Sequence, residues 1–185
     1  FFLRMEVHLL GEMKGAVGVA MPNISCRFRV VTNQDDEEHW MLNEGEFENY
    51  TQMCGNTPVV WNHPLDVSFF TTSVACWPQL YIEVWSQDEY GRNDIAGYGM
   101  IQVPSCPGEY ADLDAVLWRP QGTLMERLRA SFLGGYPQLI DPESSVIVKS
   151  PMILHSECPP PLQSTPSNLL CHPVSFRFLL LLLLL

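Results

Sequence analysis

Short segments in which apolar and polar residues alternate recur along most of the chain, and Gly and Pro residues separate them. In Ser25–Val31, for example, Cys26, Phe28 and Val30 fall on one face of an extended segment. The other expected strands cover residues 5–11, 47–51, 58–61, 65–71, 81–85 and 95–103. The Gly-rich stretch 11–23 is expected to be a loop. Short strands with frequent turns predict an all-β, antiparallel β-sandwich instead of alternating strand–helix units.

One short helix is expected near residues 124–133. Thr123 and Glu126 stand at the spacing of a capping box, in which each side chain bonds the backbone of the other residue. Gly134-Gly135 and Pro137 follow, and such residues end helices. A helix of about three turns depends on packing for its stability. We therefore expect it to cover one end of the sandwich.

The chain divides into three parts by composition. Residues 1–4 show no pattern, residues 5–150 form the expected sandwich domain, and residues 151–185 form a Pro-rich tail that ends in a run of leucines. The leucine run, 179–185, is much shorter than the ~20 apolar residues that cross a bilayer as a helix. We expect the tail to be disordered, although Val146–Val148 is a candidate for the start of a further strand.

Charge narrows the choice of partners. The chain has 185 residues, of which 21 are Asp or Glu and 10 are Lys or Arg, so its formal net charge is −11. Nucleic acids and anionic lipid surfaces attract Lys and Arg, so an acidic chain predicts neither nucleic-acid binding nor direct membrane insertion. A credible signal peptide is not visible, which favours a cytoplasmic location.

The segment Val84–Gly99 resembles the third calcium loop of C2 domains, but Ser86 stands where the first acid of that loop is expected. Asp88 and Asp94 are the remaining acids, and the partner loop, 15–25, contains neither Asp nor Glu. Ca²⁺ prefers six to eight oxygen ligands. A hydrogen-bonded turn is therefore favoured, and a calcium- or lipid-binding C2 module remains the alternative.

Catalytic patterns are weak. No Gly-x-Ser-x-Gly motif occurs, and no Gly-rich loop before a helix carries a Lys for phosphate binding. Asp112 and Asp114 would share a face of an extended segment, as glycosidase carboxylates do, but close acids arise by chance in so acidic a chain. We predict a protein that is not an enzyme and needs no cofactor or metal.

Tryptophan and arginine are better candidates for function, since they are enriched in binding hot spots. Any single tryptophan is also a natural core or rim residue of a sandwich. The candidate partner-binding residues are Trp61, Trp77, Trp85, Trp118 and Arg119.

Several short motifs, taken in order, resemble the B-nine domain family of ciliary transition-zone proteins, a divergent branch of C2-like sandwiches. The motifs span roughly Met5 to Leu139. They are Glu6-Val7-His8, Gly15-Ala16-Val17-Gly18, Trp61-Asn62-His63-Pro64-Leu65-Asp66, Trp77-Pro78-Gln79-Leu80, Val84-Trp85-Ser86-Gln87-Asp88, Ala96-Gly97-Tyr98-Gly99, Val103-Pro104-Ser105-Cys106-Pro107-Gly108, Trp118-Arg119-Pro120 and Gly134-Gly135-Tyr136-Pro137-Gln138-Leu139.

The resemblance implies a C2-like β-sandwich that acts as a non-catalytic adaptor of a tectonic-like complex at the ciliary transition zone. Such a protein supports ciliogenesis and the gating of ciliary membrane proteins. Its implied partners are sister B-nine domain proteins, the large Meckel-syndrome protein and transmembrane members of the complex, and its implied place is the cilium base, including the basal body. Family members continue into further strands after the Pro-Gln-Leu motif, whereas the tail here differs. The resemblance therefore implies a missing closing strand and an unpaired sheet edge.

Overall fold

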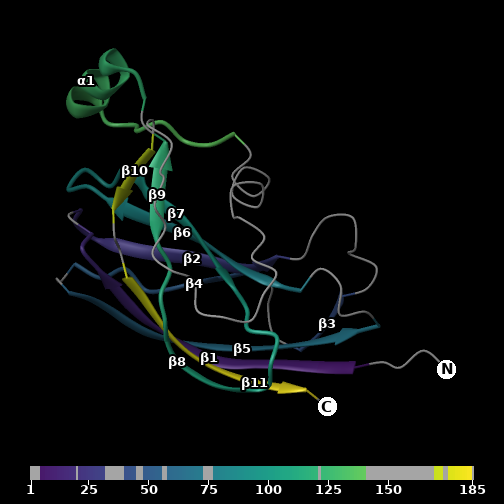
Figure 1. The fold of residues 1–185 in the computed structure, drawn as a ribbon. Helices are drawn as coiled ribbons and strands as arrows, with labels where there is room; N and C mark the ends of the chain where they lie inside the picture. The colour runs from purple at the N-terminus through teal and green to yellow at the C-terminus, as the bar shows by residue number, and fades with distance from the viewer. Residues whose placement is uncertain are drawn as a thin grey trace.

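Two antiparallel β-sheets pack face to face in the computed structural model, and a single described helix, α1, stands beyond one end of them (Figure 1). The structure describes residues 5–19, 21–31, 40–44, 48–55, 58–72, 77–120, 122–140, 169–172 and 175–184. The elements are β1 (Met5–Val17), β2 (Ile24–Val31), β3 (Trp40–Glu44), β4 (Glu48–Tyr50), β5 (Val59–Thr71), β6 (Gln79–Gln87), β7 (Asn93–Gln102), β8 (Gly108–Leu113), β9 (Leu117–Pro120), α1 (Leu124–Leu133), β10 (Leu169–His172) and β11 (Ser175–Leu184).

The strand order is β3-β5-β1-β11-β8 in the five-stranded sheet and β10-β9-β7-β6-β2-β4 in the six-stranded sheet. The main hydrophobic core lies between the sheets, and Phe28 and Phe69 are among its fully buried side chains. In β2, Cys26, Phe28 and Val30 are buried as the alternation predicts. The all-β sandwich predicted from the sequence is thus confirmed.

Strands β1 and β5 are longer than the sequence pattern predicts. Residues 11–17, expected to be a loop, continue β1, and β5 joins the two segments expected at 58–61 and 65–71. At Gly15 a Cβ atom would lie 2.1 Å from the carbonyl oxygen of Val59 on β5, so the strands approach more closely than a side chain allows. Pairing with neighbours on both sides holds this Gly-rich stretch extended, and this tertiary effect overrides local preference.

The expectation of a disordered tail is wrong for its final part. β11 lies between β1 and β8 and pairs antiparallel with both, and β10 pairs with β9 in the other sheet. The leucine run therefore supplies the strand that the sequence analysis expected to be missing, and the sandwich extends beyond residue 150 to 184. The reason is backbone pairing, because a strand inserted between two others satisfies its N–H and C=O groups on both sides. Residues 141–168, which include Val146–Val148, lie outside the described residues.

The helix forms where it was expected. The Thr123 hydroxyl accepts a hydrogen bond from the Glu126 N–H, and the Glu126 carboxylate accepts one from the Thr123 N–H, so the predicted capping box is present. Gly134 and Gly135 have φ values of 74° and 83° and end the helix in the left-handed region that favours glycine. The expectation that α1 packs its apolar side over the sandwich is wrong, because Leu124, Leu128 and Phe132 are exposed. Among the described helices, none is long and apolar enough to span a bilayer.

Candidate functional site

The outward side of the six-stranded sheet carries an aromatic cluster that is separate from the main core. Alternation along β6 sends Leu80, Ile82 and Val84 into the core and the residues between them outward. A register shift in the β6–β7 pairing beside Trp85 brings both Ile95 and Tyr98 to this side, although they are an odd number of residues apart. We call this surface the outer aromatic face; its central side chains are Tyr81, Trp85, Ile95, Tyr98, Met100 and Trp118, with Arg27 and Arg29 at its margins.

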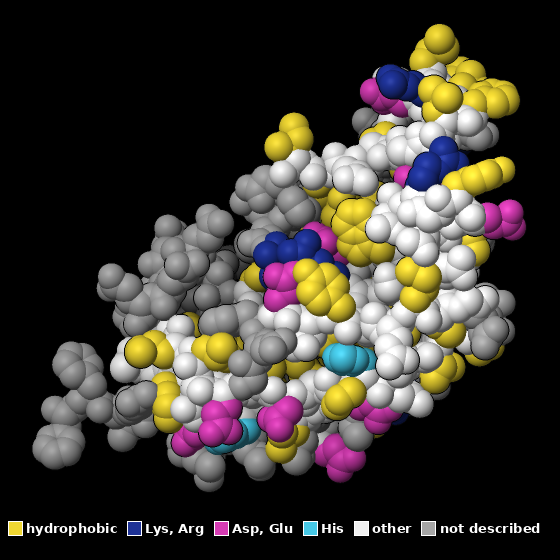
Figure 2. Space-filling model, turned by 180° about the vertical axis from the view of Figure 1, so that it is seen from behind, with side chains coloured by type: hydrophobic (Ala, Val, Ile, Leu, Met, Phe, Trp, Pro, Cys, Tyr) yellow, Lys and Arg dark blue, Asp and Glu magenta, His cyan; other side chains and the backbone are white. Residues whose placement is uncertain are grey.

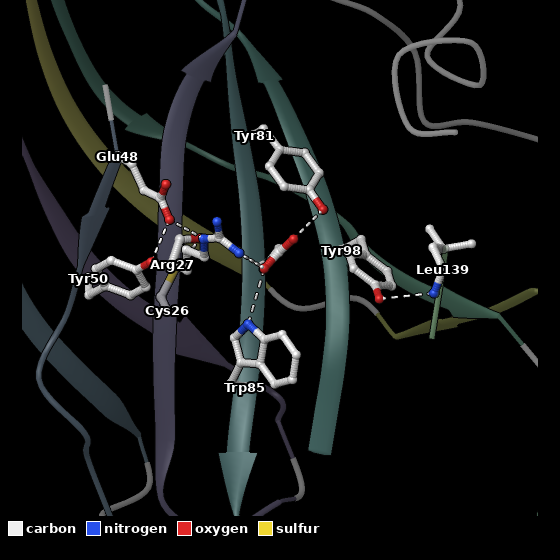
Figure 3. Close-up of polar contacts among 9 residues, drawn as sticks. Cys26, Arg27, Glu48, Tyr50, Tyr81, Trp85, Tyr98 and Leu139 are labelled. Atoms are coloured by element: carbon white, nitrogen blue, oxygen red, sulfur yellow. Dashed lines mark hydrogen bonds and ion pairs between the residues drawn. The ribbon is translucent and has the colours of Figure 1, made fainter. Parts of the chain in front are cut away.

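A buried carboxylate organises this face. Glu83 is 3% exposed, and its oxygens accept hydrogen bonds from the Tyr81 hydroxyl at 2.8 Å and the Trp85 indole N–H at 3.2 Å. The Arg27 guanidinium donates a third hydrogen bond at 3.3 Å and supplies the opposite charge. Figure 3 shows these three side chains converging on the carboxylate from two neighbouring strands. Because a buried charge is costly unless it is paired and hydrogen-bonded, this arrangement holds the surrounding rings in fixed positions.

Arg27 also joins the carboxylate to the edge strand. Its Nε donates to the carboxylate of Glu48 on β4, and the Tyr50 hydroxyl donates to the same carboxylate. The hydrogen bond with Glu48 raises the pKa of Arg27, and the bond from Arg27 lowers the pKa of Glu48. Burial, and then the negative charge of Glu83, raise the pKa of Tyr81. These shifts favour a charged Arg27, an ionised Glu48 and a neutral Tyr81 at neutral pH.

Trp118 extends the face onto β9, and Arg119 follows it in that strand. The Trp118 ring lies 5.8 Å from the Tyr98 ring, between centroids, and the Arg119 guanidinium lies 4.8 Å from the centroid of Tyr136. The chain after α1 returns over this surface, where the Leu139 N–H donates to the Tyr98 hydroxyl. Trp85, Trp118 and Arg119 are all half-buried. The structure thus gathers two of the five candidate partner-binding residues, Trp85 and Trp118, on one surface, whereas Arg119 points to the other side of β9 and contacts Met21.

The other two candidates lie elsewhere. Trp61 on β5 packs against the main core, and its indole N–H donates to the Ile24 carbonyl at 3.3 Å. Trp77 also packs against the core, edge-to-face with Trp40 at 5.3 Å, and donates to the Pro104 carbonyl. Both rings therefore pack against the core of the sandwich, which is the structural role that any single tryptophan was also expected to have.

The β6–β7 hairpin, which resembles a calcium loop in sequence, has an arginine bound to its first acid. Asp88 accepts hydrogen bonds from the backbone N–H groups of Tyr90 and Arg92 and forms an ion pair with the Arg92 guanidinium at 2.6 Å. These hydrogen bonds, that from the Arg92 N–H first, lower the pKa of Asp88. The positive charge next to the carboxylate is thus an arginine of the chain itself. Gly91 has a φ of 79°, as the predicted turn requires.

The remaining oxygens of this loop are also engaged. Asp94 accepts a hydrogen bond from the Gly135 N–H at 3.1 Å, and Ser86 donates to the Pro22 carbonyl at 2.6 Å. The Asn23 side chain donates to the Gln87 carbonyl, so the loop before β2 does lie against this hairpin, as its expected role as partner loop requires. Within the described part of the chain, no three His, Cys, Asp or Glu side chains gather where they could hold a metal ion. Hydrogen bonds and an ion pair within the chain therefore engage the hairpin's polar side chains.

Two central residues were not identified as functional from the sequence. Alternation in the sequence puts Glu83 on the same side of its strand as Tyr81 and Trp85. An acid between two aromatic residues on one face can indicate a buried carboxylate. Arg92 gave no such signal, because one of its partners, the Leu133 carbonyl, is 41 residues away in sequence.

The fold and the hairpin together define a C2-like β-sandwich in which Ser86 stands at the first position of the calcium-type loop and Arg92 is paired with Asp88. The family model described as "Ciliary basal body-associated, B9 protein" matches residues 7–158. The chain belongs to this B9 family. It is 41% identical over 140 residues to B9 domain-containing protein 2 of Bos taurus, and 39% identical to that of Homo sapiens, in each case over 73% of this chain and 76% of the relative. B9 domain-containing protein 1 of Xenopus laevis is 25% identical over 142 residues, which cover 74% of this chain and 70% of that protein.

Proposed function

We propose that this chain is a non-catalytic adaptor subunit of the tectonic-like complex at the ciliary transition zone, where it supports ciliogenesis and the gating of ciliary membrane proteins. It binds sister B9 sandwiches, such as B9 domain-containing protein 1, together with the large Meckel-syndrome protein and transmembrane members of the complex. Membership of a ciliary basal body-associated family supports the location at the cilium base, on the cytoplasmic side.

The observation that carries the proposal is the outer aromatic face. Its centre is fixed by the buried Glu83 network, while Trp85 and Trp118 keep part of their surface open to solvent. Rigid aromatic side chains lose little conformational entropy on binding, and tryptophan is among the residues that dominate binding energies in protein interfaces. A face of this composition suits contact with another folded protein.

Co-purification with B9 domain-containing protein 1 tests the proposal. We expect the wild-type chain to bind it, and we expect Trp118→Ala and Trp85→Ala each to weaken binding about tenfold or more, as hot-spot substitutions do. Val60→Ala, at an exposed position of β5 in the other sheet, is the control and should bind as wild type. Thermal melts check that each variant is folded. Equal binding by all three variants would contradict the role of this face.

Calorimetric titration with Ca²⁺ separates the adaptor from the alternative, a calcium- or lipid-binding C2 module. Because Arg92 holds Asp88 and the Gly135 N–H holds Asp94, we expect no binding tighter than about 10⁻⁴ M, the weak end of known protein sites. A tighter site would revive the alternative.

A further inference from the structure

Helix α1 turns its large apolar side chains away from the sandwich. Phe132 is 84% exposed, Met125 76%, Leu124 70% and Leu128 50%, whereas Ala130 is buried. Figure 2 shows hydrophobic side chains gathered on the projecting end of the molecule that carries this helix. Soluble proteins rarely leave contiguous apolar side chains open unless the surface binds something.

These four residues form one stripe, which we call the helical stripe: Leu124, Met125, Leu128 and Phe132. At about 100° per residue they fall within an arc of roughly 100°, and Ala130 lies on the other side of the helix. The exposed Arg127 and Arg129 fall on either side of the arc. Glu126, the only acid of the helix, has a carboxylate oxygen bound to the Thr123 N–H in the capping box. The stripe is therefore apolar with positive charge along both margins.

The β6–β7 hairpin holds the C-terminal end of this helix. Arg92 Nη1 donates to the Leu133 carbonyl at 2.8 Å while the same guanidinium pairs with Asp88. Next to it, the Gly135 N–H donates to Asp94. We call these contacts the Arg92 clamp. A guanidinium at a helix C-terminus also complements the helix dipole. The clamp presents the stripe in a fixed direction, so less entropy is lost when a partner binds.

We propose that the helical stripe inserts into an apolar groove, rimmed by carboxylates, on a sister β-sandwich of the B9 family. The spacing of its anchors is that of helix-in-groove recognition, and Arg127 and Arg129 call for acidic groups at the rim. An anionic membrane is disfavoured as the occupant, since two arginines contribute only about 1 kcal/mol each near such a surface. The whole chain carries a formal net charge of −11, so such a surface also repels it. This inference rests on the proposed adaptor function and assigns a second, separate contact to it.

Calorimetry with purified B9 domain-containing protein 1 tests the stripe on the full chain. We expect Leu128→Glu/Phe132→Glu to weaken binding about tenfold or more, and Arg127→Glu/Arg129→Glu to weaken it and reverse its dependence on salt. Met41→Glu, which adds a charge at an exposed apolar position of β3, is the matched control and should change binding little. Arg92→Ala should also weaken binding, because it releases the helix end without touching the stripe.

The outcomes separate this inference from the adaptor proposal. If wild type binds and the Leu128/Phe132 variant binds equally well, the stripe inference is overturned and the adaptor proposal stands. If wild type does not bind, both fail. Three further results would each overturn the choice of partner. The first is that wild type binds phosphatidylserine vesicles and the Leu128/Phe132 variant does not; the second is that wild type self-associates in sedimentation and the variant does not. The third is a much lower melting temperature for the variant, which would show that the stripe is covered within the chain.

Discussion

Glu83 shows how much one residue decides on the outer aromatic face. A carboxylate at 3% exposure is tolerated because Tyr81, Trp85 and Arg27 all donate to it. Each donor is a large side chain that would otherwise choose among several rotamers. The acid therefore converts a loose aromatic surface into a rigid one, and rigid aromatic surfaces bind proteins well.

Replacing Glu83 should destabilise the protein and loosen the aromatic side chains around it. We expect Glu83→Ala to lower the free energy of unfolding by about 1–3 kcal/mol, because it leaves buried donors without an acceptor. Urea denaturation measures this change. Glu89→Ala, at an exposed position of the β6–β7 hairpin, is the control and should be nearly neutral. A neutral Glu83→Ala would mean that the donors find other acceptors and that the carboxylate does not organise the face.

At the scale of elements, the β6–β7 hairpin resembles a calcium loop in sequence, but its polar side chains connect it to helix α1. Arg92 connects Asp88 to the end of α1, and Asp94 connects the same hairpin to the turn after α1. These polar contacts hold the C-terminal end of the helix, while the side chains of the helical stripe remain exposed to solvent.

The pKa of Asp88 reports on its contacts with Arg92. Hydrogen bonds and the ion pair from Arg92 hold this pKa below its ordinary value, so the contribution to stability is present above the unfolded pKa of about 3.9. It is lost as the pH falls through the lower, folded pKa. Carboxyl NMR titration should show the lowered pKa in wild type and a smaller lowering in Arg92→Ala, which loses the guanidinium but keeps the backbone N–H donors of residues 90 and 92. An unchanged titration in that variant would show that Arg92 does not control Asp88.

For the whole molecule, β11 decides whether the sandwich is closed. It pairs with β1 along almost the full length of β1 and with β8 on its other side. Without it, β1 would become an exposed edge and β8 would lose the one partner that the described sheet gives it. Exposed edges of long strands promote aggregation.

Truncation should therefore harm this protein. We expect a chain ending at residue 168, which lacks β10 and β11, to lose cooperative thermal unfolding and to aggregate on size-exclusion chromatography. Removing residues 1–4, which precede β1, is the control and should leave both properties unchanged. A truncated chain that melts cooperatively as a monomer would show that β11 is dispensable, as the sequence analysis expected of the tail.

The sequence by itself determined the local features: the alternation of β2 and β6, the turn at Gly91, the capping box of α1 and its glycine stop. Each depends on residues within a few positions of one another, so pattern and propensity suffice. From these features and the ordered motifs, the all-β sandwich and the family followed.

Tertiary structure alone decided the rest. It packed the half-buried Trp61 and Trp77 against the core, placed Trp118 beside Tyr98, and joined Arg92 to a helix end 41 residues away. It also made a strand of a leucine run that has no alternating pattern. In each case the partners are distant in sequence, and the free energy comes from pairing and packing that exist only once the sheets have formed.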